Sequence, residues 1–136
     1  MKALVVLAAL AGTAVAGDPE PPFAMQRVAG PPRAHLDETR FVPELGALWR
    51  YGPTVVLYDG SEWRRASGAV PSDEHTEIAE EQTRLDVIVR GGHVAFAVTA
   101  TSKWRDCHGS GNCDAWKHVT NRVVCWKEPQ LLCVFE

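Results

Sequence analysis

The sequence predicts a mainly β protein, a small antiparallel barrel or sandwich of about six to eight strands with one or two short helices and C-terminal hairpins stapled by disulfides. Three observations carry this prediction. Beyond Phe41 apolar and polar residues alternate over most of the chain, glycine-containing turn signals separate the alternating runs, and all four cysteines fall in the last thirty residues.

The chain opens with the pattern of an export signal. Residues 1–16 carry one positive charge at Lys2, an apolar core from Ala3 to Leu10, and a small-x-small cleavage site at Ala14-Val15-Ala16. The apolar run is shorter than the ~20 residues that a membrane-spanning helix needs. We therefore predict a signal peptide at residues 1–16 and a secreted, extracellular protein that no membrane segment holds.

The segment after the predicted signal peptide lacks the pattern of a helix or a strand. Residues 17–40 hold five of the nine prolines and show no apolar period, which predicts a proline-rich disordered arm before a single β-rich domain at residues 41–136. Removal of Lys2 with the signal leaves thirteen basic and seventeen acidic residues. This mild negative balance argues against nucleic acid as a partner.

One short motif in the arm matches a known family. The string Gln26-Arg27-Val28-Ala29-Gly30 resembles the Q-x-V-x-G inhibitory loop of the cystatins, which implies a protease inhibitor. In that family a long helix precedes the motif, whereas a signal peptide and prolines precede it here, and the cysteine spacing differs. The resemblance covers five residues, so the chain as a whole is not assigned to the family.

The first element of the domain is predicted to be helical. Apolar residues recur at helical spacing from Phe41 to Trp49, between Pro43, a good first-turn residue, and Gly52, a good stop. A hairpin follows, because Asp59-Gly60 suits a two-residue turn between two strand-like runs, Thr54 to Tyr58 and Ser61 to Ala66. That turn sets Val56 opposite Trp63. Trp63 falls on a face shared with apolar residues, so it is expected in the core.

The stretch from Ser72 to Gln82 is the most acidic part of the chain. Pro71-Ser72 is a helix-start signal, so a short exposed helix is predicted here. A cation or basic-partner site on the same carboxylates is the alternative, but the run lacks the glycine that a calcium loop needs. No metal site is predicted.

The clearest element is the hairpin around Gly91-Gly92. Apolar residues of its two strands, Leu85 to Arg90 and His93 to Thr101, fall on one face and largely polar residues on the other. The expected pairs are Val89 with Val94, Val87 with Phe96, and Leu85 with Val98. The second strand continues in the same phase and brings Trp104 to the core side and Cys107 to the opposite side.

The cysteines fit two further short hairpins. A loop at Gly109-Ser110-Gly111 sets Cys107 opposite Cys113, and a loop at Glu128-Pro129-Gln130 sets Cys125 opposite Cys133. These local pairs are favoured, while the nested alternative, Cys107 with Cys133 and Cys113 with Cys125, stays open.

Two chemical alternatives use the same segment. A zinc site would take its ligands from the pattern C-x5-C-x4-H-x6-C, at Cys107, Cys113, His118 and Cys125, but export disfavours free thiolates. A small secreted hydrolase would use His108 or His118 with Asp106 or Asp114 in nuclease-like acid-base chemistry.

The leading hypothesis is a non-enzymatic binding protein that acts as an inhibitor or effector on an extracellular protein or glycan. Trp116 stands among polar residues and is the best candidate for an exposed aromatic anchor, next to a loop that offers Ser110, Asn112 and His108. We expect a monomer without cofactor, metal or membrane partner. A third hypothesis, a carrier of an apolar ligand, predicts an apolar cavity under Phe96, Val98 and Trp104.

Overall fold

In the computed structural model, which describes residues 21–136, every regular element is a strand. The ten strands are β1 Phe23–Ala24, β2 Gln26–Val28, β3 Glu38–Val42, β4 Gly46–Tyr51, β5 Thr54–Tyr58, β6 Trp63–Ser67, β7 Thr76–Arg90, β8 His93–Asp106, β9 Lys117–Lys127 and β10 Leu131–Phe135. The predicted β class is confirmed. The expected signal peptide and the start of the arm lie outside the described residues.

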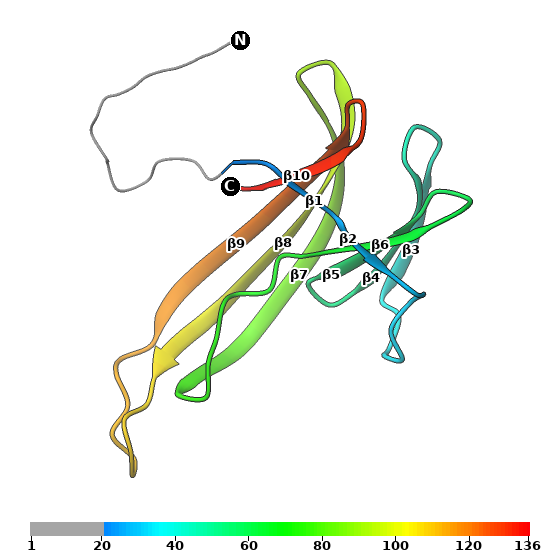
Figure 1. Ribbon diagram of the computed structural model, residues 1–136. Coiled ribbons are helices and arrows are strands. Elements are labelled where there is room, and N and C mark those ends of the chain that lie inside the picture. Colours follow the sequence, from blue (N-terminus) through cyan, green and yellow to red (C-terminus); the bar gives the residue numbers. More distant parts are fainter. Residues whose placement is uncertain (1–20) are drawn as a thin grey trace.

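The strands form two five-stranded antiparallel sheets that pack face to face (Figure 1). Sheet A has the order β1-β10-β9-β8-β7, and sheet B has the order β2-β6-β5-β4-β3. Leu48 and Leu57 from sheet B meet Phe96 and Val98 from sheet A in the core, and all four side chains are fully buried. The architecture is therefore a two-layer sandwich.

Part of the expected arm belongs to both sheets. β1 pairs with β10 in sheet A, and β2 pairs with β6 in sheet B. Met25, which lies between β1 and β2, is only 5% exposed and packs in the core. The segment Phe23–Val28 thus crosses from one sheet to the other, where the sequence predicted a disordered arm. Both are edge strands, which tolerate neighbouring prolines because one side of the strand needs no partner.

A hairpin of β3 and β4 replaces the first predicted helix, so that prediction is wrong. Leu45 donates its backbone N–H to the carbonyl of Val42 (2.9 Å), which closes a tight turn at Pro43. Side chains alternate as in a strand, with Phe41 72% exposed and Val42 buried. Pairing of β4 with β5 supplies hydrogen bonds and a buried face that an isolated helical turn would lack.

The β5–β6 hairpin is confirmed, but its loop is longer than predicted. Tyr58 pairs with Trp63, so the connection runs over four residues from Asp59 to Glu62, and the predicted pairing of Val56 with Trp63 is wrong. The register differs by an even number of residues. Val56 and Trp63 therefore still lie on the same face of sheet B, as the predicted pairing implied.

Asp59 holds the longer loop together. Its carboxylate accepts hydrogen bonds from the backbone N–H groups of Ser61 (2.9 Å) and Glu62 (3.0 Å), and it pairs with the Arg64 guanidinium (2.8 Å). These contacts, with the Glu62 N–H first, hold the pKa of Asp59 far below its ordinary value.

The depressed pKa of Asp59 predicts an acid-sensitive contribution to stability. Because folding lowers this pKa, the contribution is present above the unfolded value of about 4 and is lost as the pH falls towards the folded value. We expect the Asp59→Asn variant to lose less stability than the wild type between about pH 4 and about pH 2. Urea unfolding at a series of pH values measures this. Equal slopes in the two proteins would contradict it.

The acidic stretch is a strand and not the predicted helix. Asp73 makes a single turn, in which its carboxylate accepts the N–H of His75 (2.8 Å) and its carbonyl accepts the N–H of Thr76 (3.1 Å). From Thr76 onward the chain pairs with β8, where Glu77 and Arg105 lie opposite each other and form an ion pair. Cross-strand pairing thus outweighs the local helix-start signal.

The β7–β8 hairpin is confirmed in its register. Leu85 pairs with Val98, Val87 with Phe96, and Val89 with Val94. Burial follows the prediction only in part, because Val89 is 73% exposed where the end of the hairpin projects from the sandwich (Figure 1).

Beyond sheet B, strands β7, β8 and β9 continue as a three-stranded ribbon, which we call the distal ribbon (residues 76–83, 99–106 and 117–122). The chain between β6 and β7 covers its inner face. Asn121 donates its amide to the carbonyls of Gly68 (3.2 Å) and Ala69 (2.9 Å), and the Trp104 indole N–H donates to Pro71 (3.2 Å). The expected inner position of Trp104 is thereby explained. The outer face of the ribbon carries exposed side chains.

Candidate binding surface

Both local disulfides are present, Cys107–Cys113 and Cys125–Cys133, so the nested pairing is excluded. Cys125 and Cys133 face each other on β9 and β10 and are fully buried in the core. No cysteine is free, and the pattern that would bind zinc therefore offers no thiolate. The carboxylate of Glu77 lies near the sulfurs of Cys107 and Cys113, but a disulfide is not a thiolate pair.

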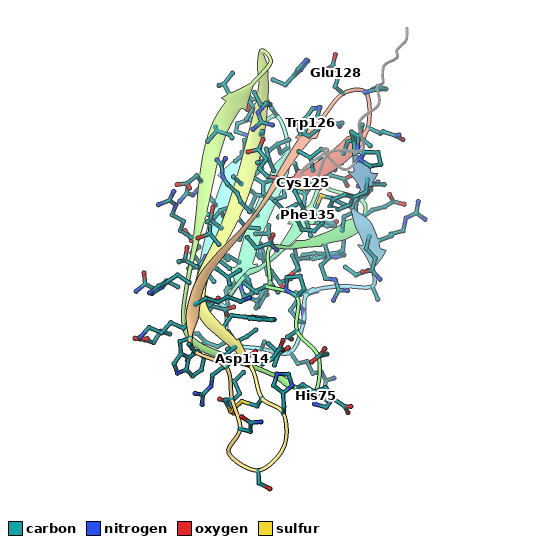
Figure 2. All side chains as sticks on the ribbon, turned by 90° about the vertical axis from the view of Figure 1, so that its left-hand side faces the viewer. His75, Asp114, Cys125, Trp126, Glu128 and Phe135 are labelled. Atoms are coloured by element: carbon teal, nitrogen blue, oxygen red, sulfur yellow. A yellow bond between two sulfur atoms is a disulfide. The ribbon has the colours of Figure 1, made fainter. Side chains whose placement is uncertain are left out.

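The Cys107–Cys113 disulfide closes the tip of the distal ribbon. Figure 2 places His75 and Asp114 at this end of the molecule and Trp126 and Glu128 at the other. His108 donates its N–H to the carbonyl of Asn112 (2.6 Å), and Asn112 donates its N–H to Gly109 (3.2 Å). The predicted loop residues Ser110, Asn112 and His108 are all exposed.

Trp116 lies beside this loop and is 40% exposed. The guanidinium of Arg105 sits 4.2 Å from the centre of the Trp116 ring, and the same guanidinium donates two hydrogen bonds to one oxygen of Glu77 (2.9 and 2.8 Å). Glu77, which lies opposite Arg105 on β7, thus orients the arginine side chain, and the arginine in turn contacts the tryptophan ring. The ring is therefore an exposed aromatic that has the Arg105 guanidinium against one of its faces.

The residues of the hydrolase alternative occupy separate surroundings. His108 Nε2 lies 3.5 Å from the carboxylate of Asp114, and both side chains are more than half exposed. Asp106 pairs with Thr76 at the start of β7. His118 stands opposite Lys103 on the outer face of the ribbon. The structure therefore brings one histidine to one carboxylate at an open tip, and it places the second histidine elsewhere.

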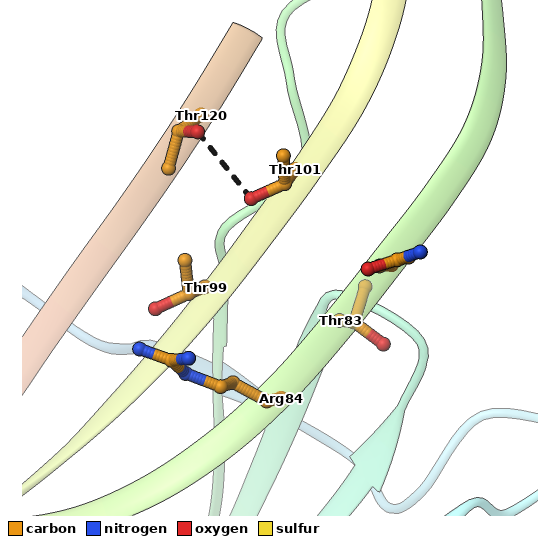
Figure 3. Close-up of a pocket in the computed structure, with 6 residues that line it drawn as sticks. Thr83, Arg84, Thr99, Thr101 and Thr120 are labelled. Carbon is orange, nitrogen blue, oxygen red and sulfur yellow. Dashed lines mark hydrogen bonds between the residues drawn. The ribbon is translucent and has the colours of Figure 1, made fainter. Parts of the chain in front are cut away.

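A polar groove lies on the outer face of the distal ribbon, and no local pattern in the sequence predicts it. Its volume is about 280 Å³. Figure 3 shows the residues that line it, which come from three neighbouring strands: Gln82, Thr83 and Arg84 on β7, Thr99 and Thr101 on β8, and Thr120 on β9. The hydroxyl of Thr83 faces the other side of the ribbon, where it accepts a hydrogen bond from Arg50 of sheet B.

A second hollow of about 220 Å³ continues this groove towards the tip, since Gln82 and Thr101 line both. Its wall includes Glu80, which sits in a bulge of β7 at a φ of 53°. The bulge directs Glu80 onto Lys103, with 2.6 Å between carboxylate and ammonium. The contact with Lys103 lowers the pKa of Glu80.

Comparison of the chain with protein-family models, with curated proteins and with solved structures finds no match in any of the three. In residues 21–136 no helix is long and apolar enough to cross a membrane.

The three residues that the carrier hypothesis places around one apolar cavity lie in two different places. Phe96 and Val98 are fully buried in the core between the sheets. Trp104 instead lines an open, almost wholly apolar hollow of about 290 Å³ with Val70, Pro71, Lys117 and Val119. The three residues thus do not share this hollow, and Lys117 lies over the Trp104 ring at 4.4 Å.

Sheet B carries an aromatic cluster that the sequence did not predict. Trp63 was expected in the core, but it lies on the outer side of β6, where it stacks on Tyr58 (4.6 Å between ring centres) and meets Trp49 edge to face (5.3 Å). Val56 is completely buried beneath this cluster. The β5–β6 loop is longer than predicted, and its length pairs Trp63 with Tyr58, which brings the two rings together.

Proposed function

We propose that this protein is a secreted binding protein that contacts an extracellular protein or glycan through the tip of its distal ribbon. The observation that carries the proposal is the exposed ring of Trp116, which contacts the Arg105 guanidinium and lies beside a loop closed by a disulfide. The two disulfides are typical of an oxidising compartment, which agrees with the export signal expected at the N-terminus.

The tip has the physical properties of a recognition surface. A tryptophan supplies a large contact area and few rotamers, and tryptophan and arginine are the side chains that most often dominate binding energy. Arg105 and Glu77 already hold the ring of Trp116, and the disulfide already limits the loop. Less conformational entropy is then lost when a partner binds.

Trp116→Ala tests the proposal. We expect the variant to lose at least about tenfold in affinity for the partner, the usual loss when a central aromatic anchor is truncated. The measurement is binding of labelled protein to two arrays, one of immobilised glycans and one of immobilised extracellular proteins.

Phe41→Ala is the matched control, because it truncates another exposed aromatic, on β3 of sheet B and 72% exposed. It should bind as the wild type does. If Trp116→Ala binds every array target as well as the wild type, or if the control loses as much, the tip is not the contact surface.

A further inference from the structure

The outer face of the distal ribbon has the chemistry of a carbohydrate site. The groove is lined by three threonine side chains, those of Thr99, Thr101 and Thr120, together with the amide of Gln82 and the guanidinium of Arg84. Hydroxyl and amide groups both donate and accept hydrogen bonds, which matches the mixed donors and acceptors of sugar hydroxyls.

One of these groups lacks a partner. Thr99 is nine-tenths buried, and its hydroxyl makes no hydrogen bond to any group in the described part of the chain. A buried hydroxyl without a partner costs free energy, so it gains when a ligand supplies one. Figure 3 shows Thr99 on the wall of the groove, with the Arg84 side chain reaching across β8 towards it. Arg84 is largely exposed, and a ligand can take its place over Thr99.

The charges along the groove are paired. Arg84 donates to Asp86 (3.0 Å), and Lys103 contacts Glu80 (2.6 Å). No uncompensated charge from these four side chains faces the ligand, which favours a neutral molecule over an acidic one.

The groove and the tip share one face. Lys103 and Arg105 follow Thr101 on the same side of β8, and Arg105 carries the ring of Trp116. Trp116 precedes Thr120 by four residues, which corresponds to about 13 Å along an extended strand. A linear oligosaccharide spans that distance and a single sugar does not.

We propose that the ligand of this protein is a neutral linear oligosaccharide, which stacks on Trp116 and lies along β8 to Thr99. This inference rests on the proposed function and names its partner class. An extended peptide fits less well, because the groove offers no apolar side pockets for alternate residues.

The test is NMR titration of the ¹⁵N-labelled protein with cellotetraose, xylotetraose, mannotetraose and chitotetraose, with tetragalacturonate and a Ser/Thr-rich octapeptide as comparisons. At least one neutral sugar should shift the amide signals of Thr99, Thr101 and Thr120. The corresponding disaccharide should bind at least about tenfold more weakly, because it cannot reach both Trp116 and the groove.

The variant Thr101→Val/Thr120→Val removes two groove hydroxyls that hydrogen-bond to each other (3.3 Å) at exposed positions. It should weaken the sugar about fivefold or more, since each hydroxyl contributes a hydrogen bond to the ligand. Thr39→Val, at an exposed position on β3 of sheet B, is the control and should change nothing. Thermal unfolding of both variants checks that the fold is kept.

Three results would overturn the inference. The first is that no neutral sugar shifts the groove amides, and the second is that the peptide or the acidic sugar does so in their place. The third is wild-type sugar affinity in Thr101→Val/Thr120→Val. If an array partner is lost with Trp116→Ala while the groove variant binds it normally, the tip proposal stands and the oligosaccharide proposal fails.

Discussion

The double variant Cys125→Ala/Cys133→Ala is expected to lose about 3 to 5 kcal/mol of its free energy of unfolding. Two costs combine. Opening the disulfide frees the unfolded chain. Truncating two fully buried side chains also leaves a cavity beside Phe96 of β8, which pairs with Cys125 of β9. Urea unfolding under two-state conditions measures the loss.

The matched control is Cys107→Ala/Cys113→Ala. Its disulfide joins residues six apart in sequence, against eight for the buried one, so the entropic cost is similar. It sits at the partly exposed tip and leaves no core cavity, so we expect a loss of about 2 to 3 kcal/mol. An equal or larger loss in this control would show that burial of Cys125 and Cys133 adds nothing.

Gly46→Ala is expected to destabilise the fold by about 3 kcal/mol or more. Gly46 starts β4 at a φ of 130°, a conformation that residues with a side chain rarely adopt. A Cβ atom built there would also lie 2.3 Å from the carbonyl oxygen of Tyr58. That oxygen belongs to the backbone of β5, so relief requires the two strands to separate.

Gly92→Ala separates the two costs of the Gly46 substitution. Gly92 has a φ of 83° in the β7–β8 turn, but a Cβ atom added there would meet nothing within 4 Å. This control has only the backbone strain, so we expect a loss of about 1 kcal/mol. Comparable losses for both variants, measured by thermal unfolding, would rule out the contact with Tyr58 as the cause.

Hairpins that depend on neighbouring residues could be predicted from the sequence. Gly91-Gly92 specified both the turn and the register of β7 and β8, because apolar residues alternate on each side of it. The loops at Ser110 and Pro129 likewise set each cysteine opposite its partner. Local spacing was sufficient in these cases, since each contact closes a short piece of chain.

The predicted helices failed for one common reason. Pro43 and Pro71 are real local signals, but both precede turns that lead into strands. The partners that decide the outcome, β5 for β4 and β8 for β7, follow later in the chain. Tertiary pairing commonly overrides a helix propensity of a few tenths of a kcal/mol per residue.

The residues of the candidate site also differ in whether the sequence alone could predict them. Trp116 could be selected from the sequence because polar residues surround it, and the structure confirms that it is exposed. Nothing local connects Gln82, Thr99 and Thr120, which meet only because β7, β8 and β9 lie side by side.

By itself, the sequence predicted the β class, the β7–β8 register, the local cysteine pairs as the favoured pairing, and an exposed aromatic near the Cys107–Cys113 loop. Only the tertiary structure decided that Phe23–Val28 joins the two sheets, that Trp63 faces outward, and that one face of the distal ribbon stays open. The physical reason is the range of the interactions. Turns and short loops close over a few residues, whereas the cover over each sheet face comes from segments far away in the chain.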